Sequence, residues 1–351
     1  MPDAAMQIGG NCSGSSAGPD RECTPGMKFR HGMLIAAAVA VLAGPAAAGG
    51  MVDYPQRSVT LVVPAPVGGT TDTLCRFIAD GLRIALGKPA VVENRPGAVG
   101  SIGASAVAVA QPDGHTLLCT PDAPIVHSPL VNRSLPYDAR AFAPVVSLAA
   151  AYSVIAARRD FRVNTVTELI GYARANPGKI NHATGGNGSG SQLGTSQFAC
   201  STGVEMVNIP YQGSAPSQRA LVGGEVDILI DGLPVLLPAF RAGLVKIIAV
   251  AAPACLAELP DTQTLAEVGL GNIELLNWFG IFAPRGSPAP IIVKLNSAIN
   301  GLLGLPAVRA RFEAWAVTPL GGTPQDFAEL VKRDRQQKED VIGRRCARDA
   351  L

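Results

Sequence analysis

Four short segments rich in glycine, serine and threonine follow apolar runs along the chain, and they are the clearest candidates for chemistry. They are Pro64–Thr71, Thr120–Ala123, Gly185–Gln192 and Gly213–Ala215. Glycine lets the backbone approach a ligand closely, and hydroxyl side chains add O–H donors to the backbone N–H groups. In an open parallel sheet such loops lie beyond the carboxyl ends of strands, where helices begin and ligands bind.

Free N–H groups and the positive end of the helix dipole make a helix start attractive to an anion. A carboxylate suits four such loops and requires no lysine or arginine. One Gly-rich turn is more simply an ordinary connection, whereas four at the sheet edges favour binding. Asp72 is expected mainly to cap a helix. The candidate ligand-binding residues are Pro64, Ala65, Pro66, Val67, Gly68, Gly69, Thr70, Thr71, Asp72, Thr120, Asp122, Gly185, Gly186, Asn187, Gly188, Ser189, Ser191, Gly213, Ser214, Ala215 and Asp231.

Enzyme motifs fit the sequence poorly. Gly81–Lys88 resembles a phosphate-binding loop, but it is one residue too long and Pro89 replaces the required Ser or Thr. Gly188–Gly194 misses the dinucleotide fingerprint by one residue. The three histidines after the apolar N-terminal segment lack metal-ligand spacing and are read as structural or surface residues: His115, His127 and His182. We therefore expect no catalytic residue, no metal and no cofactor.

The composition of the 351 residues indicates a globular protein with real cores, because 48% are hydrophobic and only 16% are charged. A net charge of +2 argues against a nucleic-acid partner. Basic residues do gather near the C-terminus, but they alternate with acids and predict a solvated helix face. The basic ones are Lys332, Arg333, Arg335, Arg344 and Arg345, and the acids are Glu329, Asp334, Glu339 and Asp340.

The N-terminal segment from Met27 to Ala48 has the features of a secretory signal peptide. Basic residues precede a short apolar run, Met33–Leu42, and small residues follow it. The apolar run is too short to span a bilayer. Residues 1–26 are polar and Gly/Ser-rich, so we expect synthesis to begin at Met27, with residues 1–26 a disordered leader or a misassigned start. The predicted location is the periplasm.

The seven cysteines show no C-x-x-C pair, which argues against a zinc or dithiol redox site. Two fall in the leader, Cys12 and Cys23. The other five are widely spaced: Cys75, Cys119, Cys200, Cys255 and Cys346. Two disulfides and one free thiol are compatible with an oxidising compartment, but buried free cysteines are the expectation for most of them.

From Val59 the chain alternates short apolar runs with helical patterns. Strands are expected at Val59–Val63, Ala90–Val92 and Thr116–Cys119, with helices between them. This β-α-β-α-β order predicts a parallel sheet covered on both faces. A second series begins with a strand at Tyr152–Ala156 and a capping box at Thr165–Glu168.

The two series are similar in size and are joined near residues 145–150 and 272–278. Further strands are expected at Ile180–Ala183, Val204–Ile209, Val226–Ile230, Ile247–Val250 and Trp278–Ala283, followed by helices from about Pro290, Pro306 and Pro324. A chain that builds one lobe, then another, and returns has two crossover strands, as in a hinged clamp. We predict lobe 1 at residues 53–148 plus 275–351 and lobe 2 at 149–274.

The sequence resembles the Bug family, the periplasmic receptors of tripartite tricarboxylate transporters, over residues 53–342. Its most specific motif is Val92–Ala98, V-E-N-R-P-G-A, followed by Gly100 and Gly103. Further matches occur in order along the chain: Tyr54-Pro55, Pro112–Gly114, Pro210-Tyr211, Leu259–Asp261, Trp278, Ala283-Pro284 and Leu295-Asn296.

The resemblance implies a two-lobed α/β fold of the type II periplasmic-binding-protein (Venus-flytrap) kind, which closes on a carboxylate-containing solute. It implies that Pro64–Thr71 and Gly185–Ser191 hold the ligand, largely through backbone groups, with membrane transporter subunits as partners and a monomeric receptor. Ala65 and Val67 stand where the family has an aromatic residue and often a proline, and Gln192 replaces a common histidine. The alternatives are a small-molecule enzyme on the same scaffold and a ligand-sensing subunit.

Overall fold

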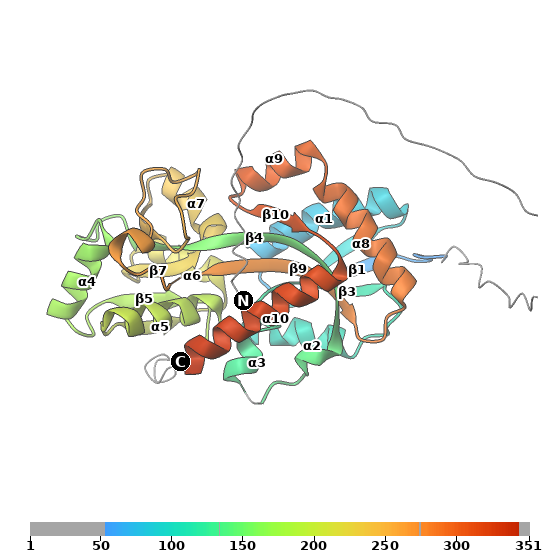
Figure 1. The fold of residues 1–351 in the computed structure, drawn as a ribbon, viewed down its shortest axis with the longest axis horizontal. Coiled ribbons are helices and arrows are strands. Elements are labelled where there is room, and N and C mark those ends of the chain that lie inside the picture. The colour runs from blue at the N-terminus through green and yellow to red at the C-terminus, as the bar shows by residue number, and fades with distance from the viewer. Residues whose placement is uncertain (1–52, 133, 274, 344–351) are drawn as a thin grey trace, which may run out of the picture. The chain divides into compact units, whose positions relative to one another are not determined.

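A mixed sheet of ten strands runs through the described part of the chain, which in this computed structural model is residues 53–343 without 133 and 274. The main strand order is β2-β1-β3-β9-β4-β7-β5-β6, and β8 and β10 both pair with β4. Figure 1 shows helices on both faces of this sheet. The leader and signal peptide predicted from the sequence lie outside the described residues.

The first series folds as the sequence predicts. Strand β1 (Val59–Val63) pairs in parallel with β2 (Ala90–Asn94) and with β3 (Thr116–Pro121). The connecting helices are α1 (Thr70–Leu86) and α2 (Ser101–Ala108). Since all three strands point the same way, their carboxyl ends open on one edge of the sheet.

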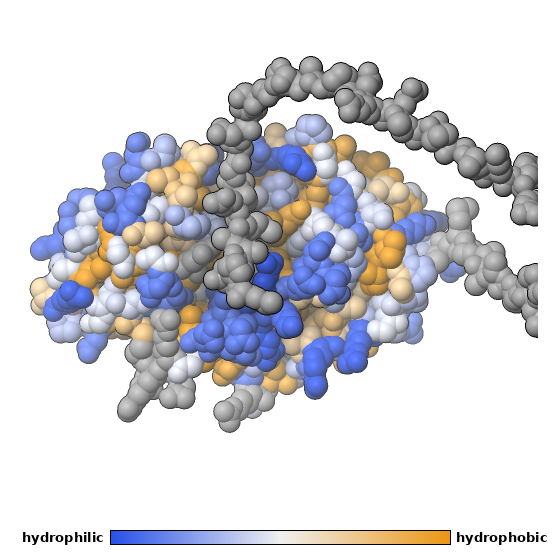
Figure 2. Space-filling view, in the orientation of Figure 1, coloured by the Kyte–Doolittle hydropathy of each residue, from blue (hydrophilic) through white to orange (hydrophobic). Residues whose placement is uncertain are grey.

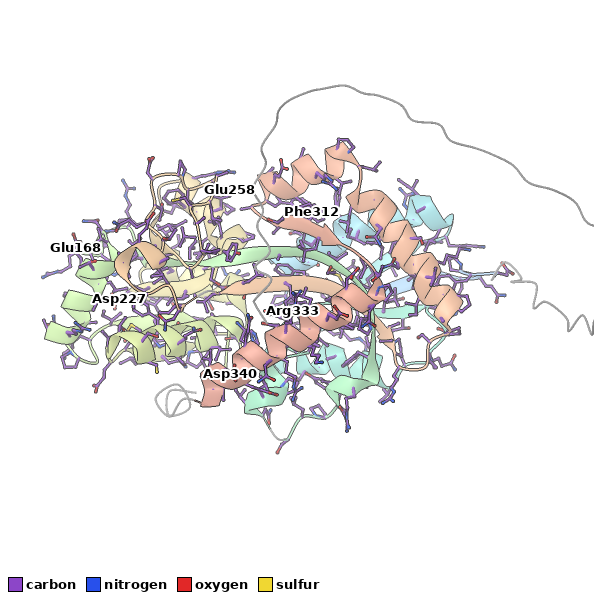
Figure 3. All side chains as sticks on the ribbon, in the orientation of Figure 1. Glu168, Asp227, Glu258, Phe312, Arg333 and Asp340 are labelled. Carbon is purple, nitrogen blue, oxygen red and sulfur yellow. A yellow bond between two sulfur atoms is a disulfide. The ribbon has the colours of Figure 1, made fainter. Side chains whose placement is uncertain are left out.

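The second series repeats this arrangement. Its parallel strands are β5 (Asn181–Thr184), β6 (Val207–Pro210) and β7 (Ile228–Gly232), and its helices are α4 (Val166–Ala175), α5 (Gly190–Thr202) and α6 (Ser214–Gly223). The predicted capping box is confirmed: Thr165 Oγ1 accepts the Glu168 N–H at 3.1 Å, and Glu168 Oε2 accepts the Asn164 N–H at 2.7 Å. Figure 3 labels Glu168 at this end of α4.

Two antiparallel strands carry the chain between the two series. β4 (Phe142–Arg158) pairs with β9 (Leu276–Pro284) as far as Tyr152, and then with β7 and β8 (Val245–Val250) from Ser153 or Val154 onward. The sequence predicts only a segment near the C-terminal end of β4, Tyr152–Ala156. Because these central strands run against the others, the sheet is mixed and not parallel throughout.

Alternating residues of each buried strand face different cores. Leu61 and Val63 pack with α1 and with α8 (Ala289–Leu303), whereas Val62 faces α2 and α10 (Pro324–Gly343) on the opposite side. The second series is built in the same way, with α4 and α5 on one face and α6 and α7 (Leu233–Arg241) on the other. Burial on both faces explains why the strands read as continuous apolar runs.

The C-terminal part contains α8, α9 (Pro306–Ala314), β10 (Thr318–Gly321) and α10. No single helix of the described residues is long and apolar enough to cross a membrane; α8 and α9 pass that test only as a pair bent by 75°. Along α10, Arg333 and Asp340 are exposed, as predicted (Figure 3), and the visible surface there is hydrophilic (Figure 2). The prediction of a solvated face is wrong for Asp334, which is buried. Its Oδ2 accepts a hydrogen bond from Trp278 Nε1 at 2.9 Å, which compensates for the lost water.

Cysteine pairing also corrects an expectation. Cys75 on α1 and Cys119 on β3 form a disulfide, and Cys200 is disulfide-bonded as well, so most of the described cysteines are not buried free thiols. The free cysteine among the described residues is Cys255, and it is exposed. Cys346 lies outside those residues.

Candidate functional site

The starts of four helices, α1, α5, α6 and α7, line one cavity of about 150 Å³, which has walls from both series of strands. Each of these helices follows a parallel strand. The predicted residues that line the cavity are Pro64, Ala65, Pro66, Gly69, Thr70, Thr71, Asp122, Gly185, Ser189, Ser191, Gly213, Ser214, Ala215 and Asp231. The sequence argument from strand ends therefore brings these loops to one place.

Other predicted residues do not line this cavity: Val67, Gly68, Asp72, Thr120, Gly186, Asn187 and Gly188. Val67 is 68% exposed. Thr120 is fully buried, and its hydroxyl donates to the Pro121 carbonyl at 3.0 Å. These residues shape or border the loops.

Asp72 holds the first loop from inside α1. It is the third residue of that helix, and Gly69 occupies the N-cap position. Its Oδ2 accepts the Gly68 N–H at 3.0 Å and its Oδ1 accepts Asn94 Nδ2 at 2.8 Å, while Arg76 pairs with the carboxylate. Burial alone would raise the pKa of Asp72, but these donors hold it below its usual value. Asp72 thus ties the helix start to the strand end, which refines the predicted capping role.

The second loop satisfies its own polar groups. Ser191 Oγ accepts the Gly185 N–H at 2.8 Å and lies 3.0 Å from Ser189 Oγ, which also accepts the Gln192 N–H at 3.2 Å as the N-cap of α5. Gln192 Oε1 accepts the Gly188 N–H at 2.6 Å. The two hydroxyls are therefore fixed at the cavity wall by the turn that they stabilise.

Asp231 stands at the end of β7, opposite Val154 of the crossover strand β4. Its Oδ1 accepts the Gly232 N–H at 2.7 Å. Burial raises the pKa of this carboxyl, and the hydrogen bonds from Ser214 and Gly232 only partly oppose that effect. Asp231 is thus placed against the start of α6 as much as against the cavity.

Sequence reasoning missed part of the wall. The missed residues are Gly97, Val99, Gly100, Pro124, Ala151, Gln212, Gly232, Pro234, Val235, Asn277 and Phe279, whereas Pro121, Ala123 and Gly190 lie in the predicted segments Thr120–Ala123 and Gly185–Gln192. The loop after β2 belongs to this group, and Val99 has a φ of 51°, a strained value for a β-branched residue. Its signal was available, because β2 is a parallel strand whose carboxyl end shares the same edge.

Asn277 and Phe279 lie on the second crossover strand, β9. Asn277 Nδ2 donates to Ser153 Oγ at 2.8 Å, which joins the two crossover strands beside the cavity. The expected connection near residues 272–278 was a signal for them. Any strand that passes between two lobes must pass the floor of the space between them.

The electrostatic character of the cavity is unusual for an anion site. Among its lining residues the side chains with ionisable groups are Asp122 and Asp231, and none is a lysine, arginine or histidine. Positive potential at the cavity therefore comes from backbone N–H groups at the helix starts, supported by serine and threonine hydroxyls. This arrangement can hold a carboxylate.

A second cavity of about 360 Å³ adjoins the first and shares five residues with it: Gly69, Thr70, Ala215, Pro234 and Val235. It continues to Trp315 after α9 and to Arg241 of α7. Arg241 is the charged residue of its lining. None of the five shared residues is aromatic or charged.

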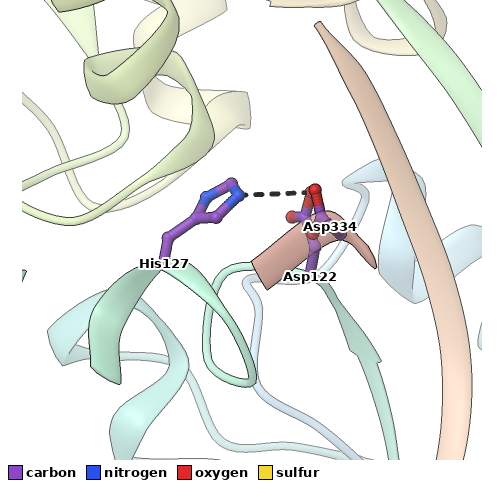
Figure 4. A group of neighbouring side chains, drawn as sticks. All are labelled: Asp122, His127 and Asp334. Carbon is purple, nitrogen blue, oxygen red and sulfur yellow. Dashed lines mark ion pairs between the residues drawn. The ribbon is translucent and has the colours of Figure 1, made fainter. Parts of the chain in front are cut away.

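At one wall of the cavity, the structure brings together Asp122 and His127, which are close in sequence, and Asp334, which is distant from both (Figure 4). His127 Nε2 lies 3.6 Å from Asp122 Oδ2. Burial raises the pKa of Asp122 well above its usual value, with Asp334 adding to the effect, and it lowers that of His127 well below. Spacing along the chain gave no sign of this group, because its members come from two distant segments.

Known proteins resemble the chain over most of its length. The family described as tripartite tricarboxylate transporter family receptor matches residues 74–346. A Pseudomonas sp. protein encoded between tcbD and tcbE is 35% identical over 82% of this chain and 86% of its own, and BugT of Bordetella pertussis is 33% identical over 87% and 93%.

Solved structures agree. R. palustris Rpa4515, with adipate, superposes with a TM-score of 0.81 at 36% identity, covering 84% of this chain and 98% of its own. MatC from Rhodopseudomonas palustris, with bound malate, superposes with a TM-score of 0.79 at 34% identity, covering 82% of this chain and 100% of its own. The two-lobed α/β fold implied by the sequence is thus confirmed. The chain belongs to the tripartite tricarboxylate transporter receptor family, whose Bug-type members it resembles.

Proposed function

We propose that this protein is a periplasmic receptor that captures a small carboxylate-bearing solute in the cavity between its two sets of strands. The observation that carries the proposal is the meeting of the starts of α1, α5, α6 and α7 at a cavity whose lining has no cationic side chain. Relatives with adipate and with malate support a carboxylate as the ligand class. We propose further that the protein is a monomer that binds no nucleic acid, catalyses no reaction and delivers its ligand to membrane transporter subunits.

The direct test is binding of aliphatic mono-, di- and tricarboxylates, measured by calorimetry and by thermal shift. A ligand present at about 100 times its Kd adds about 2.7 kcal/mol of stability, which raises the melting temperature clearly. Amides of the same acids serve as controls, because they keep the shape and lose the charge. Equal binding of acids and amides would contradict a carboxylate receptor, and turnover of any bound compound would contradict a pure receptor.

A further inference from the structure

Asp122, His127 and Asp334 form a buried group at one wall of the cavity, and of the three only Asp122 lines the cavity itself. They come from the loop after β3, from the start of α3 (His127–Val131) and from α10, and they are 3%, 2% and 7% exposed. One nitrogen or oxygen atom of each lies within 4.8 Å of the others. Figure 4 shows the imidazole directed at the two carboxylates. Three elements thus aim polar atoms at one point.

Several of these atoms lack a hydrogen bond, although His127 Nε2 lies 3.6 Å from Asp122 Oδ2. Asp122 Oδ2, His127 Nδ1 and His127 Nε2 are buried without a hydrogen bond to any described residue. Buried polar atoms are rarely left in this state, because each forfeits its bonds to water. A metal ion can satisfy such atoms, because imidazole nitrogens and carboxylate oxygens are common metal donors.

We propose that Asp122, His127 and Asp334 form a binding site for a divalent transition-metal ion such as zinc. Two carboxylates and one imidazole are an ordinary zinc donor set, and the imidazole disfavours calcium and magnesium. Two donors at about 2.1 Å from a tetrahedral zinc lie about 3.4 Å apart. The Nε2–Oδ2 separation of 3.6 Å is already close to that value. Trp278 Nε1 donates to Asp334 Oδ2 and so orients this carboxylate.

Lys338 competes for the same position. Its Nζ lies 3.9 Å from Asp334 Oδ1, and its side chain is nearly buried. The ammonium now offsets part of the negative charge of the two carboxylates, so an entering ion must overcome its repulsion. Removal of that charge while keeping the apolar stem should therefore tighten metal binding, whereas loss of the imidazole should weaken it.

The test is titration of the untagged, chelator-treated protein with zinc chloride, followed by calorimetry and by metal analysis after desalting. All variants carry Cys255→Ser, because an exposed thiol also binds zinc. We expect one equivalent with a micromolar or lower Kd. His127→Asn and Asp334→Asn should each weaken binding at least about tenfold, since even outer partners of a metal ligand matter by that factor. Lys338→Met should strengthen binding.

His182→Asn is the matched control, because His182 is also buried but lies on β5, outside the cluster. It should leave the zinc affinity unchanged, and circular dichroism should show that every variant is folded. No saturable zinc binding by the folded parent would overturn the proposal. So would equal affinity in the parent and the folded His127→Asn or Asp334→Asn variant. Carboxylate binding is measured separately, so failure here leaves the receptor function untouched.

Discussion

At the scale of single residues, the candidate site depends on hydroxyls that serve the turn and the cavity together. Ser191 Oγ accepts the Gly185 N–H and contacts Ser189 Oγ. We expect Ser191→Ala to weaken carboxylate binding about tenfold, since an unsatisfied buried donor costs about 1–3 kcal/mol. Calorimetry with the best ligand checks this. Ser201→Ala, at the far end of α5, is the control and should bind like the parent; equal affinity in both variants would remove Ser191 from the site.

His182 predicts a pH dependence of stability. Burial lowers its pKa from 6.5 to about 4, so between these values the unfolded chain binds more protons than the folded one. Stability is therefore complete above pH 6.5 and falls as the pH drops toward 4. At pH 5 the loss attributable to His182 is about 2 kcal/mol.

Urea unfolding at pH 7.5 and pH 5 measures that loss. His182→Asn should show a smaller difference between the two pH values than the parent, although the neutral buried His127 still contributes in the same direction. An unchanged difference would show that His182 is not responsible.

Residue types predicted the loops of the site well but not their individual contacts. Gly185, Ser189 and Ser191 are in the wall because their turn joins the carboxyl end of β5 to the start of α5, at the sheet edge where the other predicted loops also lie. Asp72 lies in the first turn of α1 but does not line the cavity, because its carboxylate is held by Asn94 on β2 and by Arg76 one turn further along the helix. Asp334 was predicted to be solvated, since no pattern along α10 reveals its contact with Trp278 on β9.

At the scale of elements, Gly280 on β9 sets how closely α10 packs on the sheet. A Cβ at Gly280 would lie 2.1 Å from Phe327 Cζ. We expect Gly280→Ala to lower the unfolding free energy by about 1–3 kcal/mol, as overpacking does. Adding Phe327→Leu should recover part of the loss. Gly301→Ala on the exposed side of α8 is the control, because its Cβ meets nothing within 4 Å, and it should be neutral or stabilising. Denaturant unfolding compares the three variants with the parent. A Gly280→Ala variant as stable as the parent would refute this packing.

The Cys75–Cys119 disulfide joins the first helix to the third strand across 44 residues of sequence. Its removal in Cys75→Ala/Cys119→Ala should cost about 2–4 kcal/mol. Urea unfolding measures the change, and Cys255→Ser, which removes the exposed thiol, should cost little. Equal stability of the double variant and this control would mean that the disulfide does not stabilise the fold.

Most elements could be predicted, since apolar strands and capped helices carry local signals. The full length of β4 could not, because Phe142–Arg158 lies in both parts of the sheet and its burial changes with the partner strand. Helix α7 was missed because Pro234 and Pro238 obscure its period. The disulfide pairing depends on a contact across elements, which spacing cannot give.

At the scale of the whole molecule, β4 and β9 are the strands that carry the described main chain from one set of strands to the other. The cavity rims meet where a Cβ at Gly213 would lie 3.5 Å from Pro66 Cδ and one at Gly186 would lie 3.4 Å from Val99 Cγ2. A ligand that contacts both sides stabilises the arrangement in which these rims touch. We therefore predict that the lobes, residues 53–148 plus 275–351 and 149–274, move about β4 and β9.

Spin labels test this movement when placed on the exposed residues Ile84 of α1 and Val222 of α6, in a Cys255→Ser background. Without ligand we expect a broad or bimodal distance distribution, because the open and closed states are both populated. At saturating carboxylate we expect only the shorter distance to remain, since a ligand shifts the equilibrium by its differential affinity for the closed state. The Ser191→Ala variant should need more ligand for the same shift. A single distance that is the same with and without bound ligand would mean that the receptor captures its solute without closing.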